Sequence, residues 1–204
     1  MSLFYRAAYA IGFKPWEKAS IHHPAAEQVA KLFDREQSER LSPYSRALDL
    51  GCGTGHWALE LAARGWQVTG IDLVPRAIKN AKARAEKAGA KIDFVEGDVT
   101  ALRAAGIRPE FEFIWDFGTL HGLTKLEREA ASREITAVAA AGATMLMLVW
   151  TPGWRPPLPR GMSRADVEAM FSEWTVIEES EFDVSGLPPL LRRVDPRCYR
   201  LRRV

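Results

Sequence analysis

The sequence predicts an α/β fold in which a mostly parallel sheet is covered by helices on both faces. Short apolar segments alternate with helical segments between residues 24 and 150. Such alternation is typical of parallel strands, because parallel neighbours need crossover connections. The last part of the chain instead holds two alternating segments with no helix between them, which predicts a closing antiparallel pair. At 204 residues and 47% hydrophobic composition, we expect one domain around one core.

Proline and glycine mark the elements of the first half of the chain. Pro24 and Pro75 stand where a first helical turn accepts proline, and Gly65 and Gly89 stand where helices end. The segments between them are short and apolar, as in buried strands. We expect helices at residues 24–41, 57–63 and 75–89, and strands at residues 47–50, 66–71 and 92–96.

Two capping boxes mark the helices of the second half. Thr124 with Glu127, and Ser163 with Asp166, have the spacing at which a hydroxyl and a carboxylate satisfy the first helical N–H groups. Each pair therefore predicts the start of a helix. We expect helices at residues 124–140 and 163–171, and strands at residues 111–115, 143–150, 174–182 and 197–204.

The composition limits the classes of partner. The chain has 28 basic and 26 acidic residues, a net charge of +2, so no nucleic-acid or membrane partner is demanded. The apolar segment at residues 3–11 is interrupted by Arg6 and is too short to span a bilayer. Cys52 and Cys198 form neither a disulfide framework nor a metal-ligand spacing. We expect a cytoplasmic protein, monomeric or homodimeric.

A glycine-rich loop follows the first expected strand, in the order Asp49-Leu50-Gly51-Cys52-Gly53-Thr54-Gly55. A strand that enters glycines and then a helix binds polar or charged ligands, because free backbone N–H groups point there. The spacing of Gly53, Gly55 and Ala58 also satisfies the dinucleotide fingerprint, with Asp72 close to the expected downstream acidic position. A nicotinamide-dependent oxidoreductase is therefore an alternative.

Three features favour S-adenosylmethionine over a dinucleotide. Asp49 precedes the glycines, where it would repel a pyrophosphate but suit the ammonium and sulfonium groups of a cationic ligand. Asp98 follows the third expected strand and is suited to accept the adenine amino group. The third feature is the pair of final strands that no helix separates.

These features resemble the class I S-adenosylmethionine-dependent methyltransferases over residues 47–204. The resemblance implies a Rossmann-like three-layer αβα sandwich with a seven-stranded, mostly parallel sheet whose last strand is antiparallel. We expect a single methyltransferase domain over residues 1–204, with a helical cap at residues 1–45, a donor-binding core at 46–150, and a specificity loop with the strand pair at 151–204. The cofactor-binding residues that the resemblance implies, with S-adenosylhomocysteine as product, are Gly51, Gly53, Gly55, Asp72, Leu73, Asp98 and Val99.

The segment after the fourth expected strand holds two candidates for the reaction. His121 lies on the edge where ligands bind, and its near-neutral titration makes it the best candidate for a general base. Asp116 could orient His121, ligate a metal or contact the donor; we prefer donor or substrate contact and place it among the cofactor-binding residues. Enzymes that methylate exocyclic base amines usually have a polar-Pro-Pro-aromatic loop here. Its absence disfavours nucleic-acid methylation, and no metal site is expected.

The N-terminal segment is similar to the entry segment of the thiopurine and thiol methyltransferase-like group of small-molecule enzymes. The similarity rests on Gly12-Phe13-Lys14-Pro15-Trp16-Glu17, followed by His22-His23-Pro24. In that group the Pro-Trp-acidic element closes over the donor. The resemblance therefore implies that Trp16 packs on S-adenosylmethionine, and we expect His22 at the acceptor.

The Pro-rich loop at residues 151–161 is the expected specificity element. Trp154 could stack on a ring and Arg155 could bond hydroxyls or an anion. The sequence thus predicts a methyltransferase acting on a small-molecule hydroxyl or thiol, with a sugar, an oligosaccharide, a phenol or a quinol as acceptor. Oxygen is preferred because a thiol hardly needs the base that His121 supplies. A donor-binding protein without catalysis is a further alternative.

Overall fold

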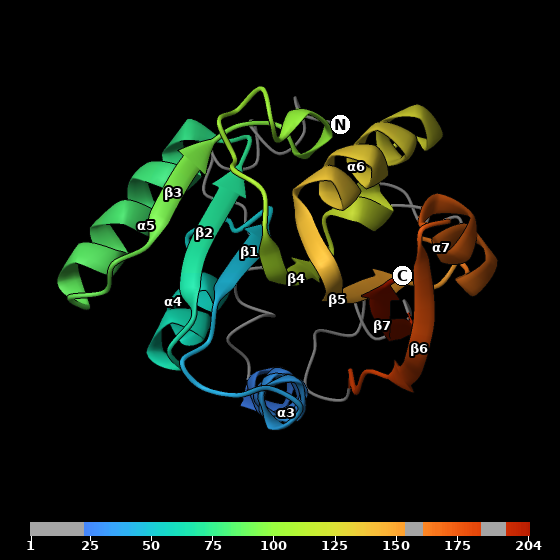
Figure 1. The fold of residues 1–204 in the computed structure, drawn as a ribbon, viewed down its shortest axis with the longest axis horizontal. Coiled ribbons are helices and arrows are strands. Elements are labelled where there is room, and N and C mark those ends of the chain that lie inside the picture. The colour runs from blue at the N-terminus through green and yellow to red at the C-terminus, as the bar shows by residue number, and fades with distance from the viewer. Residues whose placement is uncertain (1–22, 154–160, 185–194) are drawn as a thin grey trace.

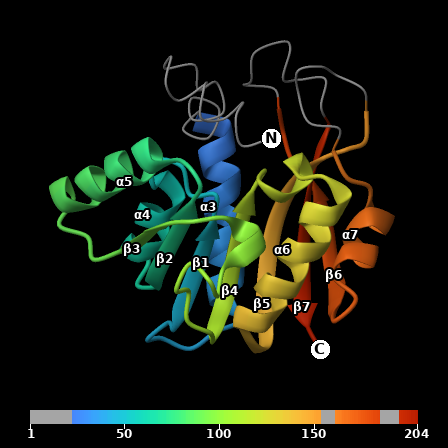
Figure 2. The same ribbon diagram turned by 90° about the horizontal axis from the view of Figure 1, so that it is seen from above.

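The computed structural model describes residues 23–153, 161–184 and 195–204. Within these ranges one sheet has the strand order β3-β2-β1-β4-β5-β7-β6 (Figure 1; Figure 2). The strands are β1 (Arg46–Leu50), β2 (Gln67–Asp72), β3 (Asp93–Glu96), β4 (Phe111–Phe117), β5 (Ala139–Trp150), β6 (Trp174–Glu181) and β7 (Pro196–Arg203).

The described strands confirm the predicted topology. The strands β1 to β5 pair in parallel, whereas β7 runs antiparallel to both of its neighbours, β5 and β6. The sheet is thus the seven-stranded, Rossmann-like sheet that the sequence predicts. The division of the whole chain into a single domain with a cap and a specificity loop stays a prediction.

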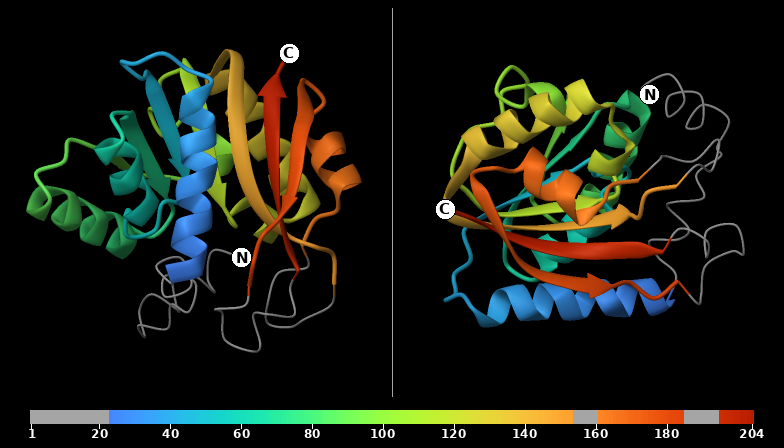
Figure 3. Two further views of the ribbon diagram at one scale, coloured as in Figure 1. Left: turned by 90° about the horizontal axis from the view of Figure 1, so that it is seen from below. Right: turned by 90° about the vertical axis from the view of Figure 1, so that its right-hand side faces the viewer.

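Helices cover both faces of the sheet. Figure 3 shows α3 along one face and α6 and α7 on the other. The helices are α3 (His23–Ser38), α4 (His56–Ala63), α5 (Pro75–Lys87), α6 (Lys125–Val138) and α7 (Arg164–Met170), with short 3₁₀ turns η1 (Val99–Ala101) and η2 (Leu120–Gly122). Both predicted capping boxes are present, at the starts of α6 and α7.

The end of α6 differs from its prediction. We expected a helix to residue 140 and a strand from residue 143, but α6 ends at Val138 and β5 begins at Ala139. Ala139 is already extended, with φ −75° and ψ 145°, and pairs with Phe111. The register then shifts, because the next pair joins Phe113 to Thr144 and leaves extra residues of β5 unpaired. Alanine has a strong helix propensity, so the alanine-rich junction predicts a helix, but pairing of Ala139 with β4 makes it a strand.

Two buried clusters occupy the two faces of the sheet. The face toward α6 and α7 is aliphatic, with Leu50, Ile114 and Met147 among its members. The opposite face is more aromatic, and there Phe33 of α3 packs edge-on against the Trp115 ring, with ring centroids 5.0 Å apart. Burial of such apolar surface contributes roughly 25 cal/mol per Å², so the aromatic face holds α3 on the sheet.

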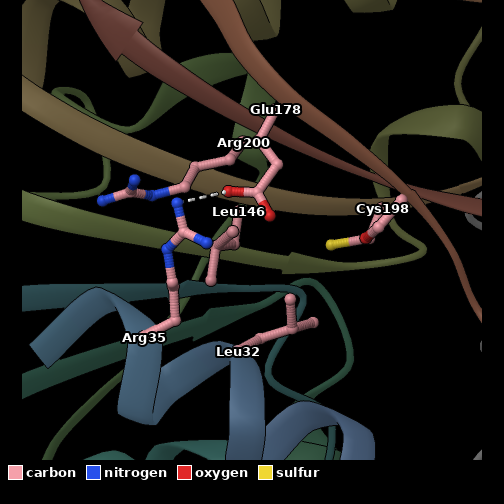
Figure 4. A pocket seen from close by; sticks show the side chains of 7 residues that line it. Leu32, Arg35, Leu146, Glu178, Cys198 and Arg200 are labelled. Carbon is pink, nitrogen blue, oxygen red and sulfur yellow. Dashed lines mark ion pairs between the residues drawn. The ribbon is translucent and has the colours of Figure 1, made fainter. Parts of the chain in front are cut away.

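A buried ion network adds to this attachment. Glu36 of α3 is 1% exposed and bonds Arg200 of β7, whose guanidinium also bonds Glu39. Beside the network lies a cavity of about 10 Å³, where Arg35 and Glu178 pair at 3.2 Å (Figure 4). A cavity of this size holds about one water molecule, so it is too small for an acceptor.

Candidate active site

The glycine loop joins β1 to α4 and depends on left-handed backbone conformations. Gly51, Gly53 and Gly55 have φ values of 62°, 54° and 76°, where residues with a Cβ are strained. Two of them also lack room for a side chain. A Cβ at Gly51 would lie 2.0 Å from Thr119 Oγ1, and one at Gly55 would lie 2.8 Å from the Phe94 ring. The loop therefore needs glycine for its backbone and for its neighbours.

Asp49 is the buried carboxylate of this loop. It is 2% exposed, and its Oδ2 has no hydrogen-bond partner among the described residues. Burial raises its pKa well above the ordinary value, and the neighbouring charges of Asp72 and Asp116 raise it further. A buried oxygen without a donor is costly. The site therefore fits a cationic ligand, such as the ammonium end of S-adenosylmethionine.

Asp72 stands at the end of β2 and links two loops. Its Oδ2 accepts from the N–H of Gly53 at 2.9 Å, and its Oδ1 accepts from the N–H of Val74 at 2.8 Å. The carboxylate thereby fixes the strand end against the glycine loop, with the half-buried Leu73 beside it. This is the edge at which ligands bind in open α/β sheets.

The third strand end carries the remaining residues of the predicted donor site. Asp98 is exposed and begins η1, and its Oδ1 accepts from the backbone N–H and the hydroxyl of Thr100. Val99 is buried at 6% exposure. Asp72 at the end of β2 pairs with Glu96 at the end of β3. Asp98 follows Glu96 by two residues and therefore lies at the same edge of the sheet as Asp72. The structure thus brings the described residues of the predicted donor site to one edge of the sheet.

Asp116 organises the turn after β4. It is fully buried, its Oδ1 accepts from the N–H of Thr119 at 2.9 Å, and it also accepts from Leu120. Burial raises the pKa of Asp116 to about 7, although these backbone bonds lower it. The Thr119 hydroxyl donates to the carbonyl of Leu50 at 3.1 Å. The turn is therefore fastened directly to the glycine loop.

His121 lies in this turn, within η2. It is 3% exposed, and its ring stacks on Trp150 with centroids 4.8 Å apart and planes 29° apart. Its carbonyl accepts a hydrogen bond from Arg128 at 2.7 Å. The imidazole thus has a defined place after the end of β4, in the turn that contacts the glycine loop.

The structure adds residues to the predicted site and leaves others undescribed. Thr119 and Arg128 were not predicted, because only their long-range contacts mark them. Four predicted residues lie outside the described ranges, and their roles stay predictions: Trp16, His22, Trp154 and Arg155.

Other features of the described part of the chain lie away from this edge or do not form a metal site. A groove of about 480 Å³ lies at the opposite sheet edge, lined by Arg46, Gln67 and Asp93 among others. Within the ranges described, no group of three or more His, Cys, Asp or Glu side chains could hold a metal ion. No helix there is both long and apolar enough to cross a membrane.

Comparison with known proteins identifies the family. A family model described as a methyltransferase domain matches residues 47–142. The chain is 31% identical over 167 residues to the 2-heptyl-1-hydroxyquinolin-4(1H)-one methyltransferase of Mycobacteroides abscessus, covering 79% of this chain and 69% of that protein. The chain therefore belongs to the S-adenosylmethionine-dependent methyltransferases, and S-adenosylmethionine is its methyl donor.

Further relatives match over different lengths. A ubiquinone biosynthesis O-methyltransferase of Cereibacter sphaeroides is 43% identical over 84 residues, which are 40% of this chain and 34% of that protein. A solved structure from work on the conversion of a disulfide bond into a thioacetal group during echinomycin biosynthesis has a TM-score of 0.77 at 25% identity, covering 100% and 93% of the two chains.

Two solved structures with bound donor or product share the fold. The N-methyltransferase from Bradyrhizobium japonicum with S-adenosyl-L-homocysteine has a TM-score of 0.74 at 20% identity, covering 91% of this chain and 90% of that one. The magnesium protoporphyrin IX methyltransferase of Synechocystis with bound S-adenosylmethionine has a TM-score of 0.75 at 14% identity, covering 100% and 97%. At these identities the likeness concerns the fold alone.

Proposed function

We propose that the chain transfers a methyl group to a hydroxyl of a small molecule, with His121 as general base. The observation that supports this most is the place of His121. Its turn is fastened to the glycine loop through Thr119, whose hydroxyl donates to Leu50. A hydroxyl is a poor nucleophile unless its proton is removed, and an imidazole within reach of it performs this task near neutral pH.

The residues divide the work between donor and acceptor. S-adenosylmethionine supplies an electrophilic methyl group on a sulfonium. Asp49 and Asp72 offer carboxylates to its cationic and hydroxyl groups, and the glycines let the backbone approach it. His121 accepts the proton of the acceptor hydroxyl while the acceptor oxygen bonds to the methyl carbon and the carbon–sulfur bond breaks, which leaves S-adenosylhomocysteine. The protein thus contributes alignment and one proton acceptor, as an in-line displacement requires.

We propose a flat aromatic hydroxyl compound as acceptor. The relatives support this, because one is named for a hydroxyquinolinone and another for ubiquinone biosynthesis. A sugar hydroxyl and a thiol are the alternatives. We further propose a cytoplasmic monomer or homodimer with no nucleic-acid or membrane partner, in keeping with the net charge of +2.

An acceptor panel tests the proposal. Release of S-adenosylhomocysteine is measured with 2-heptyl-1-hydroxyquinolin-4(1H)-one, the compound named for the relative, and with catechol, glucose and thiophenol, each with and without a chelator. We expect turnover of an aromatic hydroxyl compound that the chelator does not reduce. Turnover of thiophenol alone would contradict an oxygen acceptor. Donor binding without turnover of any acceptor would favour a donor-binding protein.

The role of His121 as general base is tested with two acceptors, of which only the hydroxyl compound needs a base. His121→Gln should reduce turnover of the hydroxyl acceptor by roughly 10²–10⁴ while affinity for S-adenosylhomocysteine stays the same. Thiophenol is the matched control, because it is ionised at about pH 8 and needs no base. Equal losses with both acceptors, or unchanged turnover with the hydroxyl acceptor, would rule out this role.

A further inference from the structure

Arg128 of α6 joins two segments beside His121. One nitrogen of its guanidinium, Nη2, donates to the carbonyl of His121 at 2.7 Å and to the carbonyl of Gly161 at 3.0 Å. His121 belongs to the turn after β4, whereas Gly161 lies 33 residues beyond Arg128. A single side chain therefore fixes the relative position of two distant backbone segments.

Gly161 is itself pressed against the end of β5. It has a φ of 82°, and a Cβ there would lie 2.3 Å from the carbonyl oxygen of Trp150. The next residue, Met162, donates its N–H to that same oxygen at 2.8 Å. Because the Trp150 ring stacks on His121, the contacts form a closed circuit from His121 through Arg128, Gly161 and Trp150 back to His121.

The guanidinium is held there at a cost. Arg128 is half-buried, its Nε is buried with no hydrogen-bond partner, and no carboxylate lies within ion-pair distance among the described residues. Burial lowers the pKa of Arg128, which the charge of Asp166 opposes only in part. A half-buried cation without an ion pair loses hydration that no opposite charge replaces, and natural proteins break such local rules mainly at functional sites.

We propose that Arg128 is a positioning residue for methyl transfer, which holds the His121 turn against Trp150 so that the imidazole keeps one orientation. The proposal rests on the proposed function of His121. In this role Arg128 acts through His121, whose carbonyl it contacts. Displacement of a catalytic group by about 1 Å can reduce a rate by roughly 10²-fold, which sets the expected effect of removing the guanidinium.

Kinetics of matched variants test the catalytic part. With 2-heptyl-1-hydroxyquinolin-4(1H)-one as acceptor, Arg128→Met should lower kcat about 100-fold while affinity for S-adenosylhomocysteine stays within about twofold. Arg128→Lys should recover about tenfold, because an ammonium donates to carbonyls without the planar fork. The exposed Arg133 on the same helix supplies the control, and Arg133→Met should behave as the parent.

A double variant tests whether Arg128 acts through His121. In a His121→Gln background, Arg128→Met should lower kcat less than about twofold, since the two changes remove one effect. A full 100-fold further loss, or a parallel loss of S-adenosylhomocysteine affinity, would show a general structural role and overturn the proposal. Thermal unfolding checks each variant first, and Arg128→Lys carries the comparison if the Met variant does not fold.

Nuclear magnetic resonance separates this proposal from the proposed function. The chain has four histidines, so His121→Gln identifies the imidazole signals of His121. Arg128→Met should shift these signals, and Arg133→Met should leave them in place. Unchanged signals in Arg128→Met overturn the positioning role alone. Full turnover of His121→Gln removes the proposed base and, with it, the catalytic role of Arg128, even where the signals move.

Discussion

Replacing Gly51 by alanine tests how the glycine loop and the β4 turn depend on each other. Gly51 has a φ of 62°, and an added Cβ would lie 2.0 Å from Thr119 Oγ1. Gly89 offers a matched control, since its φ is 64° and a Cβ there would meet nothing within 4 Å. Both alanine variants therefore carry the same backbone strain, and only one carries the steric conflict.

The two costs can be estimated separately. A left-handed alanine costs about 1 kcal/mol, which is the whole effect expected for Gly89→Ala. At Gly51 the side chain of Thr119 must also move, which adds about 1 kcal/mol for its hydrogen bond to Leu50 and about 1–2 kcal/mol for overpacking. Gly51→Ala should therefore lower the free energy of unfolding by about 3–4 kcal/mol.

Thermal unfolding and donor binding measure the outcome. For a chain of this size, Tm should fall by about 3 °C for Gly89→Ala and by about 10 °C for Gly51→Ala. Affinity for S-adenosylhomocysteine should fall at least about tenfold for Gly51→Ala alone. Removing the hydroxyl in Gly51→Ala/Thr119→Ala should recover part of the loss. Equal effects of the two single glycine changes on Tm and affinity would refute the reasoning.

Three further changes probe charge. Burial raises the pKa of Asp116 to about 7. Between about pH 4 and pH 7 the folded chain therefore keeps a proton that the unfolded chain has released, so the free energy of unfolding falls as the pH rises. In the parent, this loss of free energy of unfolding should be on the order of 3 kcal/mol between about pH 5 and pH 8, as measured by urea unfolding. Asp116→Asn should remove the loss, whereas Asp93→Asn, at an exposed position, should leave it in place. Asp49→Asn should weaken S-adenosylmethionine binding roughly 10–100-fold. In the parent, calorimetry should show that the affinity for S-adenosylmethionine falls as the pH drops through the raised pKa of Asp49, because a protonated carboxyl no longer attracts the cation. An affinity that does not change with pH would contradict this expectation. Arg200→Met removes one buried partner of Glu36, which keeps its ion pair with Arg40 at 2.7 Å. The change should lower the free energy of unfolding by about 2 kcal/mol without changing product affinity at 25 °C. A stability within about 0.5 kcal/mol of the parent would contradict this estimate.

Local signals predicted most of the fold. The capping boxes at Thr124 and Ser163 are present, and the strand topology is confirmed. These features succeed because the hydrogen bonds that define a helix start are made within four residues. The junction at Ala139 was predicted wrongly, since its conformation depends on pairing with Phe111, 28 residues earlier (139 − 111). Propensity is a weak guide where tertiary contacts decide.

The candidate site likewise contains residues that local signals predict and residues that only long-range contacts define. Asp72 and Asp98 could be predicted because parallel strands end at one sheet edge, so acidic residues at strand ends gather there. Arg128 could not, because its partners are backbone carbonyls, which leave no mark on the sequence. Thr119, two residues before His121, could not be predicted for the same reason: its hydroxyl donates to the backbone carbonyl of Leu50 on the neighbouring strand β1.

The carboxylates at the sheet edge explain why the loop suits a cationic donor although its spacing also fits a dinucleotide. Burial and then the charges of Asp72 and Asp116 raise the pKa of Asp49, so the ionised carboxylate of Asp49 is disfavoured unless a cation lies beside it. A pyrophosphate would add to that charge at close range in a medium of low dielectric constant. An ammonium and a sulfonium reduce it, and binding of the donor therefore favours the ionised form of Asp49. We therefore expect the charge of the edge, more than the glycine spacing, to select the donor.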